Sequence, residues 1–125
     1  MSRPKRSAVL LAGFLGGAGV LHFAVPKAFD SMVPRVLPGA PRTWTYGSGA
    51  VELALAAGLA HPRTRAAAAR MTAGLFVGVF PANVQMAVDW RHRPRPLRVA
   101  AWARLPVQVP LVLWAREVAR DAKRT

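Results

Sequence analysis

Hydrophobic residues gather in four long segments of the chain, at residues 7–25, 44–60, 66–88 and 99–119. Each segment approaches the ~20 residues that an α-helix needs to cross the hydrocarbon core of a bilayer. Charged residues fall mostly in the short stretches between these segments. The pattern predicts an all-α protein, folded as an antiparallel four-helix transmembrane bundle with both termini on one side.

Lysine and arginine divide unequally between the two predicted sides of the membrane. By our division about ten lie on the side of the termini and about seven on the other, which predicts cytoplasmic termini in a multi-pass protein of the cell membrane. Basic residues followed by an apolar run from Ala8 also resemble a signal peptide. No clear cleavage site closes that run and three more apolar segments follow, so we expect a retained first helix.

Composition leaves a second class of protein to consider. The chain has 125 residues, which suits a single domain over 1–125, and 18 Lys+Arg against 5 Asp+Glu give a net charge of +13. A soluble basic protein that binds nucleic acid could carry that charge. The clustering of the charges between apolar segments, and the lack of a basic–aromatic stacking run, favour the membrane and predict no nucleic-acid partner. No cysteine is present, which excludes disulfides and thiolate metal sites within this chain.

Two local patterns predict packing features. Gly13 with Gly17 and Gly74 with Gly78 are each four residues apart, a spacing that lets helix backbones approach closely in lipid. Chance in a chain rich in glycine and alanine explains these pairs equally well. Between the first two segments, apolar residues with helical spacing predict a short amphipathic piece lying in the outer membrane interface: Phe29, Met32, Val33, Val36 and Leu37. Pro34, Pro38 and Pro41 restrict how long any helix there can be.

Polar residues inside the apolar segments all lie toward one side of the predicted membrane. At a rise of ~1.5 Å per residue they fall roughly 4 to 15 Å below the outer surface. Asn83 and Gln85 point in opposite directions on one helix, and we favour Asn83 as the inward-facing residue. The predicted set for a ligand site is His22, Ser48, Glu52, Asn83, Arg104 and Gln108.

Glu52 is the one acidic residue deep within a segment, and Arg104 is its expected partner. This pair could simply pin the second helix to the fourth. It could instead belong to a ligand or proton-handling site, with Glu52 and His22 as candidate catalytic residues, or to a face that meets a partner protein. Pro106 and Pro110 leave carbonyl groups free, which is consistent with a bent fourth helix beside a small cavity. The spacing of histidines and acids predicts no metal site.

Four short stretches carry a family resemblance: Leu21-His22-Phe23, Tyr46-Gly47-Ser48-Gly49, Pro81-Ala82-Asn83-Val84-Gln85-Met86-Ala87 and Leu105-Pro106-Val107-Gln108. Their order and spacing resemble the DoxX-like family of small bacterial membrane proteins, over Ala8 to Ala119. The resemblance implies a four-helix integral membrane protein. Most members of that family have no assigned activity, and some resemble accessory subunits of redox or stress-response assemblies. The resemblance therefore implies an accessory role for this chain.

The sequence therefore supports two functional hypotheses within the membrane. The first is a non-enzymatic accessory subunit that binds a quinone or another lipid in a polar pocket in the outer half of the bundle, beside a membrane or redox partner protein. The second is a small membrane enzyme that performs acid/base chemistry on an apolar, lipid-like substrate, with Glu52 as general acid/base.

Overall fold

The computed structural model describes residues 2–124, and these residues form helices and turns without a strand. The elements are α1 (Arg3–Ala24), α2 (Pro26–Asp30), α3 (Pro41–Ala60), α4 (Arg65–Gly78), α5 (Phe80–Asp89), the 3-10 turn η1 (Trp90–His92) and α6 (Arg95–Arg124). The all-α prediction is confirmed.

Helix boundaries follow local signals in the sequence. Prolines stand in the first turns of α1 and α3, where a missing N–H leaves no intrahelical bond unmade, and the Ser2 hydroxyl caps α1 by accepting from the Lys5 N–H. The predicted third segment is two helices, because the chain leaves regular helix geometry at Val79 just before Pro81. The fourth helix is longer than predicted: it begins at Arg95 and continues to Arg124.

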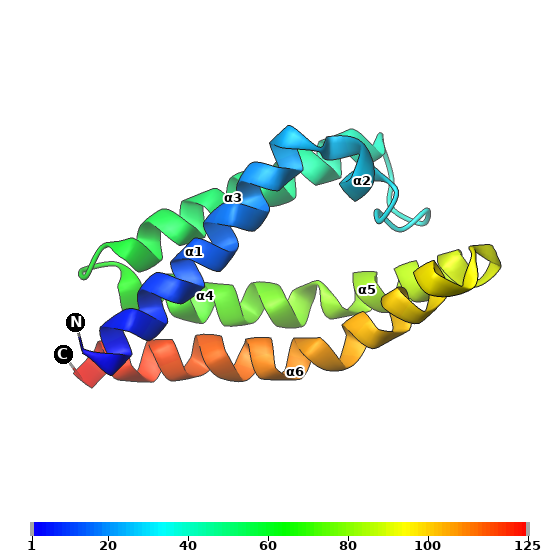
Figure 1. Ribbon diagram of the computed structural model, residues 1–125. Coiled ribbons are helices and arrows are strands. Elements are labelled where there is room, and N and C mark those ends of the chain that lie inside the picture. The colour runs from blue at the N-terminus through cyan, green and yellow to red at the C-terminus, as the bar shows by residue number, and fades with distance from the viewer. Residues whose placement is uncertain (1, 125) are drawn as a thin grey trace.

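The long helices form two antiparallel hairpins, α1 with α3 and α4–α5 with α6. Figure 1 shows both termini and the 61–64 turn at one end of the molecule, which we call the inner end. The outer end holds residues 25–40 and 89–98. The two hairpins meet at the inner end and diverge towards the outer end (Figure 1).

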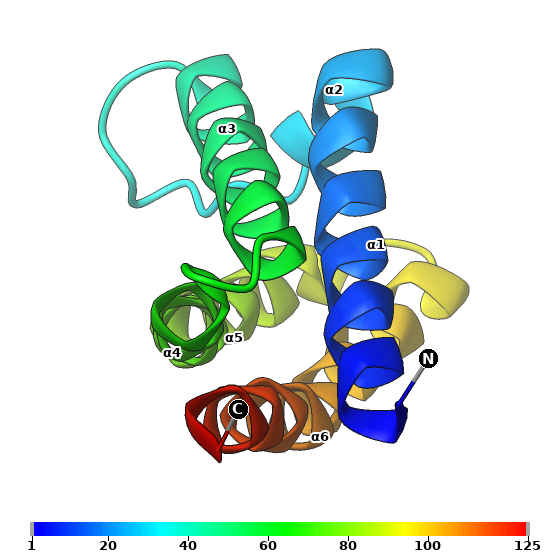
Figure 2. The same cartoon turned by 90° about the vertical axis from the view of Figure 1, so that its left-hand side faces the viewer.

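The main hydrophobic core explains why the hairpins meet where they do. It joins residues of all four long helices near the inner end: Ala8, Leu11, Leu15, Leu55, Leu59, Ala68, Ala69, Phe76, Leu111, Ala115, Val118 and Ala119. A smaller cluster near the outer end holds only α5, η1 and α6 together, through Met86, Ala87, Trp90 and Ala101. Figure 2, viewed from the inner end, shows α1 and α3 rising away from α4 and α6. A closed four-helix bundle is therefore not confirmed.

The glycines that bring helices together are not the predicted ones. A Cβ atom added at Gly13, Gly17, Gly74 or Gly78 would meet nothing within 4 Å. A Cβ at Gly49 would instead lie 2.7 Å from the His22 Cβ, and one at Gly19 would lie 3.0 Å from the Gly49 carbonyl oxygen. Close approach of α1 and α3 thus depends on Gly19 and Gly49, and the prediction from the four-residue spacing was wrong.

The segment between α1 and α3 contains one short helix, α2, followed by turns. Helix α2 ends at Asp30, before most of the expected apolar face, and residues 31–40 form turns that include Gly39 at φ 82°. Pro34 and Pro38 interrupt any longer helix here. Val33 and Leu37 are nevertheless partly buried, whereas Val36 is 74% exposed. The loop therefore turns part of its apolar side towards the protein.

Large apolar side chains cover the outside of every long helix. Examples are Leu10 at 65% exposed, Met71 at 64% and Val109 at 62%. Two stretches, Arg3–Ala24 and Arg65–His92, are long and apolar enough to cross a membrane. An apolar outer surface of this extent is unusual for a soluble monomer and typical of a surface that meets lipid or another protein.

Candidate functional site

The structure places the predicted polar residues in two separate clusters, one in each hairpin. His22 and Glu52 lie between α1 and α3. Asn83, Arg104 and Gln108 lie where α4 and α5 meet α6. Ser48, one turn before Glu52, is exposed. The sequence analysis therefore assigned to one site residues that lie in two clusters.

His22 and Glu52 form a largely buried pair. The exposed fractions of their side chains are 10% and 18%, and Glu52 Oε2 lies 3.8 Å from His22 Nδ1. His22 Nδ1 is also 2.6 Å from the Ala18 carbonyl oxygen, to which a protonated Nδ1 donates. The imidazole stacks on Phe29 with ring centroids 3.8 Å apart. This geometry fixes the histidine ring, while Glu52 Oε2 is buried and makes no hydrogen bond within the described residues.

Gln108 is the centre of the second cluster. Its side chain is buried, and its Nε2 donates to the Phe76 carbonyl oxygen at 2.6 Å. Its Oε1 accepts from Arg104 Nη1 at 2.6 Å and from Asn83 Nδ2 at 3.4 Å. The Phe76 carbonyl lies one turn before the junction of α4 and α5. The Gln108 side-chain amide therefore gives a hydrogen-bond donor to a backbone carbonyl near this junction and an acceptor to Arg104.

The predicted pair between Glu52 and Arg104 is not formed. Glu52 faces His22 within its own hairpin, and Arg104 donates to Gln108, one turn away on α6. The reason is the divergence of the hairpins: at this level α3 and α6 no longer share a core. Of the two amides in the third segment, Asn83 contacts Gln108, as we favoured, whereas Gln85 donates to Asp89.

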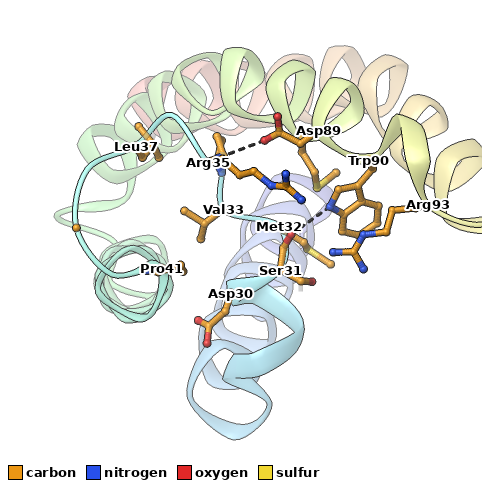
Figure 3. Close-up of a pocket in the computed structure, with 13 residues that line it drawn as sticks. Asp30, Ser31, Met32, Val33, Arg35, Leu37, Pro41, Asp89, Trp90 and Arg93 are labelled. Carbon is orange, nitrogen blue, oxygen red and sulfur yellow. Dashed lines mark hydrogen bonds between the residues drawn. The ribbon is translucent and has the colours of Figure 1, made fainter.

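A pocket of about 390 Å³ lies at the outer end, between the 31–40 loop and the end of α5 (Figure 3). Its apolar lining includes Met32, Val33, Leu37, Met86 and Trp90. Its charged lining includes Asp30, Arg35, Asp89 and Arg93. None of the six predicted ligand residues lines this pocket. Two signals could have indicated it: the apolar periodicity of the loop, and the acid and tryptophan that end the third segment.

Two hydrogen bonds join the loop to α5 and η1 across the pocket. The Arg35 backbone N–H donates to Asp89 Oδ2 at 3.2 Å, and Trp90 Nε1 donates to the Ser31 carbonyl oxygen at 3.1 Å (Figure 3). The other Asp89 oxygen, Oδ1, accepts from Gln85 Nε2 at 3.0 Å, so both carboxylate oxygens are hydrogen-bonded. These contacts reconnect the two hairpins at the end where their cores are separate.

Asp30 fixes the two ends of the loop. Its carboxylate accepts from the Thr45 hydroxyl at 2.7 Å and from Arg42 Nε at 2.8 Å, both at the start of α3. The hydrogen bond from Thr45, with help from Arg42, holds the pKa of Asp30 below its ordinary value. A carboxyl group with a depressed pKa stabilises the folded state at neutral pH and loses that contribution as the pH falls.

Acidification is therefore expected to loosen the 31–40 loop. The contribution of Asp30 is complete above the pKa of its unfolded state, about 4, and disappears as the pH falls through its lower folded value. Hydrogen-exchange protection factors in the loop should fall between about pH 6 and about pH 3. Asp30→Asn should lower the same factors at neutral pH, and the control Asp121→Asn at the inner end should not. Equal protection at both pH values would contradict this role.

Residues 2–124 contain no group of three or more histidine, aspartate or glutamate side chains placed to hold a metal ion. The recorded polar contacts of the two clusters and the pocket are hydrogen bonds and ion pairs. Arg35 and Arg93 contribute charge at the pocket, and the Arg93 guanidinium lies 5.2 Å from the centre of the Trp90 ring. A ligand with an oxygen acceptor and an apolar body matches these groups.

Comparison with known proteins gave one family. A model of the family described as Domain of unknown function (DUF8561) matches residues 11–119, which span α1 to α6. No curated protein and no solved structure gave a significant match.

Proposed function

We propose that this chain, which belongs to the DUF8561 family, is an integral membrane protein that binds a lipid-like amphiphile in the pocket at its outer end. The ligand would carry an oxygen acceptor on an apolar body, as a quinone or an isoprenoid lipid does. The protein would act as a non-enzymatic accessory subunit beside a membrane or redox partner. The resemblance to the DoxX-like family is consistent with this role and stays a prediction.

The distribution of charge supports membrane integration. Between Arg70 and Asp89 there is no charged residue, and between Arg98 and Arg116 there is only Arg104. Between Arg42 and the inner turn, Glu52 is the only acidic or basic residue before His61. The large exposed side chains along these stretches include Val51, Val77 and Val107, which are apolar. We infer four membrane-crossing passes with cytoplasmic termini, which the excess of Lys/Arg at the inner end favours.

The pocket at the 31–40 loop carries the ligand part of the proposal. Its volume falls in the range of ~300–1,000 Å³ that small-molecule sites occupy, and it joins an apolar floor to a few charged groups. Both carboxylates in it already accept hydrogen bonds from protein groups. The guanidinium of Arg35, which extends from the loop towards Trp90 in Figure 3, forms no salt bridge within the described residues. It is therefore the donor that we assign to the ligand oxygen.

The alternative of an acid/base enzyme rests on Glu52 and His22. Their proximity and the unbonded Glu52 Oε2 are the observations in its favour. Neither residue lines the pocket, and the His22 ring is fixed by Ala18 and Phe29. The ligand-binding role accounts for the pocket and is the function we propose.

Filling the pocket is expected to abolish ligand binding. Purified protein in detergent should gain thermal stability from quinones or isoprenoid lipids, because a ligand that binds only the folded state shifts its unfolding. Val33→Trp should remove this gain, since Val33 lines the pocket. The matched control is Val36→Trp, on the same loop but 74% exposed, which should keep it. The proposal fails if none of these ligands stabilises the wild type and no partner co-purifies.

The membrane part of the proposal has an independent readout. The protein should stay with the membrane fraction in high salt and at alkaline pH, and should need detergent for extraction. Release by high salt alone would overturn membrane integration and restore the interpretation as a soluble, basic nucleic-acid-binding protein.

A further inference from the structure

A second, more open concavity lies at the start of α6, outside the pocket and both polar clusters. Its volume is about 580 Å³, and it is lined by Arg91, Arg95, Arg98, Val99, Trp102 and Ala103. Three of these six residues are cationic and none is acidic. We call it the arginine groove.

The positive charge of the arginine groove is only partly compensated: the Asp89 carboxylate interacts electrostatically with Arg91, and within the described residues no groove arginine forms a salt bridge. The recorded salt bridges involve His22 with Glu52 and Arg42 with Asp30, and none of the groove arginines. Arg91 Nη1 donates to the Val88 carbonyl, which leaves its charge in place. One carboxylate, that of Asp89, stands against three groove arginines, so a net positive charge remains. Three neighbouring guanidinium groups repel one another, so the groove favours an anion.

An exposed apolar stripe continues from the groove along the same face of α6. Val99, Trp102 and Val109 are 57%, 53% and 62% exposed, and their spacing places them on one side of the helix. From Val99 to Val109 the helix rises ~15 Å, about half of the ~30 Å hydrocarbon core, which is the depth of one leaflet. A small anion would use the arginines alone, whereas a phospholipid would use both the arginines and the stripe.

We propose that the arginine groove binds one anionic phospholipid, with its phosphate among Arg91, Arg95 and Arg98 and an acyl chain along Val99, Trp102 and Val109. The zwitterionic headgroups carry an ammonium group that these arginines repel, so a net negative headgroup is preferred. Trp102 lies at the boundary between the charged and apolar parts, where tryptophan side chains favour the membrane interface.

This site also accounts for a feature that the topology alone does not. Arg91, Arg93, Arg95 and Arg98 crowd the outer end and reduce the Lys/Arg excess that would orient the protein. Binding of an anionic lipid explains why the segment 91–98 is rich in arginine although it lies at the outer end. The inference rests on the membrane integration proposed above, but not on the ligand pocket beside the 31–40 loop.

The test compares two double variants with the same loss of charge. Wild-type protein, Arg95→Gln/Arg98→Gln and the control Arg120→Gln/Arg124→Gln are reconstituted in nanodiscs of equal parts phosphatidylglycerol and phosphatidylcholine. Native mass spectrometry then counts the lipids retained after release. Wild type and control should retain one phosphatidylglycerol in preference to phosphatidylcholine, and the groove variant should lose this preference. Trp102→Ala should retain less of either lipid while the arginines keep the preference.

Three results would overturn the proposal. These are equal retention of the two lipids by wild type, an unchanged preference in the groove variant, and release of the bound lipid by inorganic phosphate, which would indicate a site for a free anion. Helicity measured by circular dichroism shows that each variant is folded. If the wild type shows no preference for phosphatidylglycerol, but Val33→Trp still removes its stabilisation by quinones or isoprenoid lipids, the inference fails and the proposed function stands. Release of the protein from membranes by salt would remove both proposals.

Discussion

Gln108→Met is expected to destabilise the protein by about 3 kcal/mol, because it leaves three groups without their hydrogen-bond partner. The Phe76 carbonyl would lose its donor at 2.6 Å, and the Arg104 guanidinium and the Asn83 amide would lose their acceptor. Methionine has a similar length and is apolar, so the change removes hydrogen bonds while it leaves little empty space. Thermal or denaturant unfolding in detergent measures the effect.

Gln85→Met is the matched control for this prediction. It makes the same chemical change on the neighbouring helix, where Gln85 donates only to Asp89 near the outer loop. That bond is between side chains at the edge of the protein, so its loss should cost less than about 1 kcal/mol. Equal stability losses in the two variants would show that Gln108 is not the centre of its cluster.

Gly49→Ala is expected to destabilise the α1–α3 hairpin by about 1–3 kcal/mol through overpacking, although alanine is the better helix former. The new Cβ would lie 2.7 Å from the His22 Cβ and 2.9 Å from Phe23 Cε2. The first of these atoms is attached directly to the backbone, so the helices must separate. This separation would also move His22 relative to Glu52. Unfolding in detergent and accumulation in membranes both report the loss.

Gly47→Ala, two residues earlier on the same helix, should have the opposite sign. A Cβ at Gly47 would meet nothing within 4 Å, so the substitution gains helix propensity without a clash, worth up to about 1 kcal/mol. The pair of variants separates packing from propensity, because both make the same change within α3. If Gly49→Ala were as stable as Gly47→Ala, the close approach of α1 and α3 would be contradicted.

The long helices could be predicted because their signals are local. An apolar segment of this length must satisfy its own backbone hydrogen bonds, and a helix does so within one segment. Prolines at the starts of α1 and α3 mark boundaries that depend only on neighbouring residues. The same locality applies before α3. Apolar periodicity and the prolines together predict a short helical piece there, and the helix α2 spans Pro26–Asp30.

The sequence could position each polar residue along its helix, but it could not predict which of these side chains contact one another. Helix rise fixes how far along its helix each polar residue lies, so the positions of Glu52, Asn83 and Arg104 along their helices followed from the sequence. Which side chains meet depends on how each helix is rotated about its axis and where the hairpins separate. Gly19 and Gly49 set the rotation of α1 and α3 about their axes. The core near the inner end sets the point where the hairpins separate.

The sequence by itself thus determined that this protein is helical, where its long helices lie, and that its charges gather at their two ends. Only the tertiary structure decided that Glu52 pairs with His22 and that Gln108 accepts a hydrogen bond from Arg104. It also decided that the pocket forms between two segments far apart in the chain, the 31–40 loop and Met86 to Arg93. The physical reason is that backbone hydrogen bonds and helix rise act within a segment. Side-chain contacts between segments depend on the packing of all of them at once.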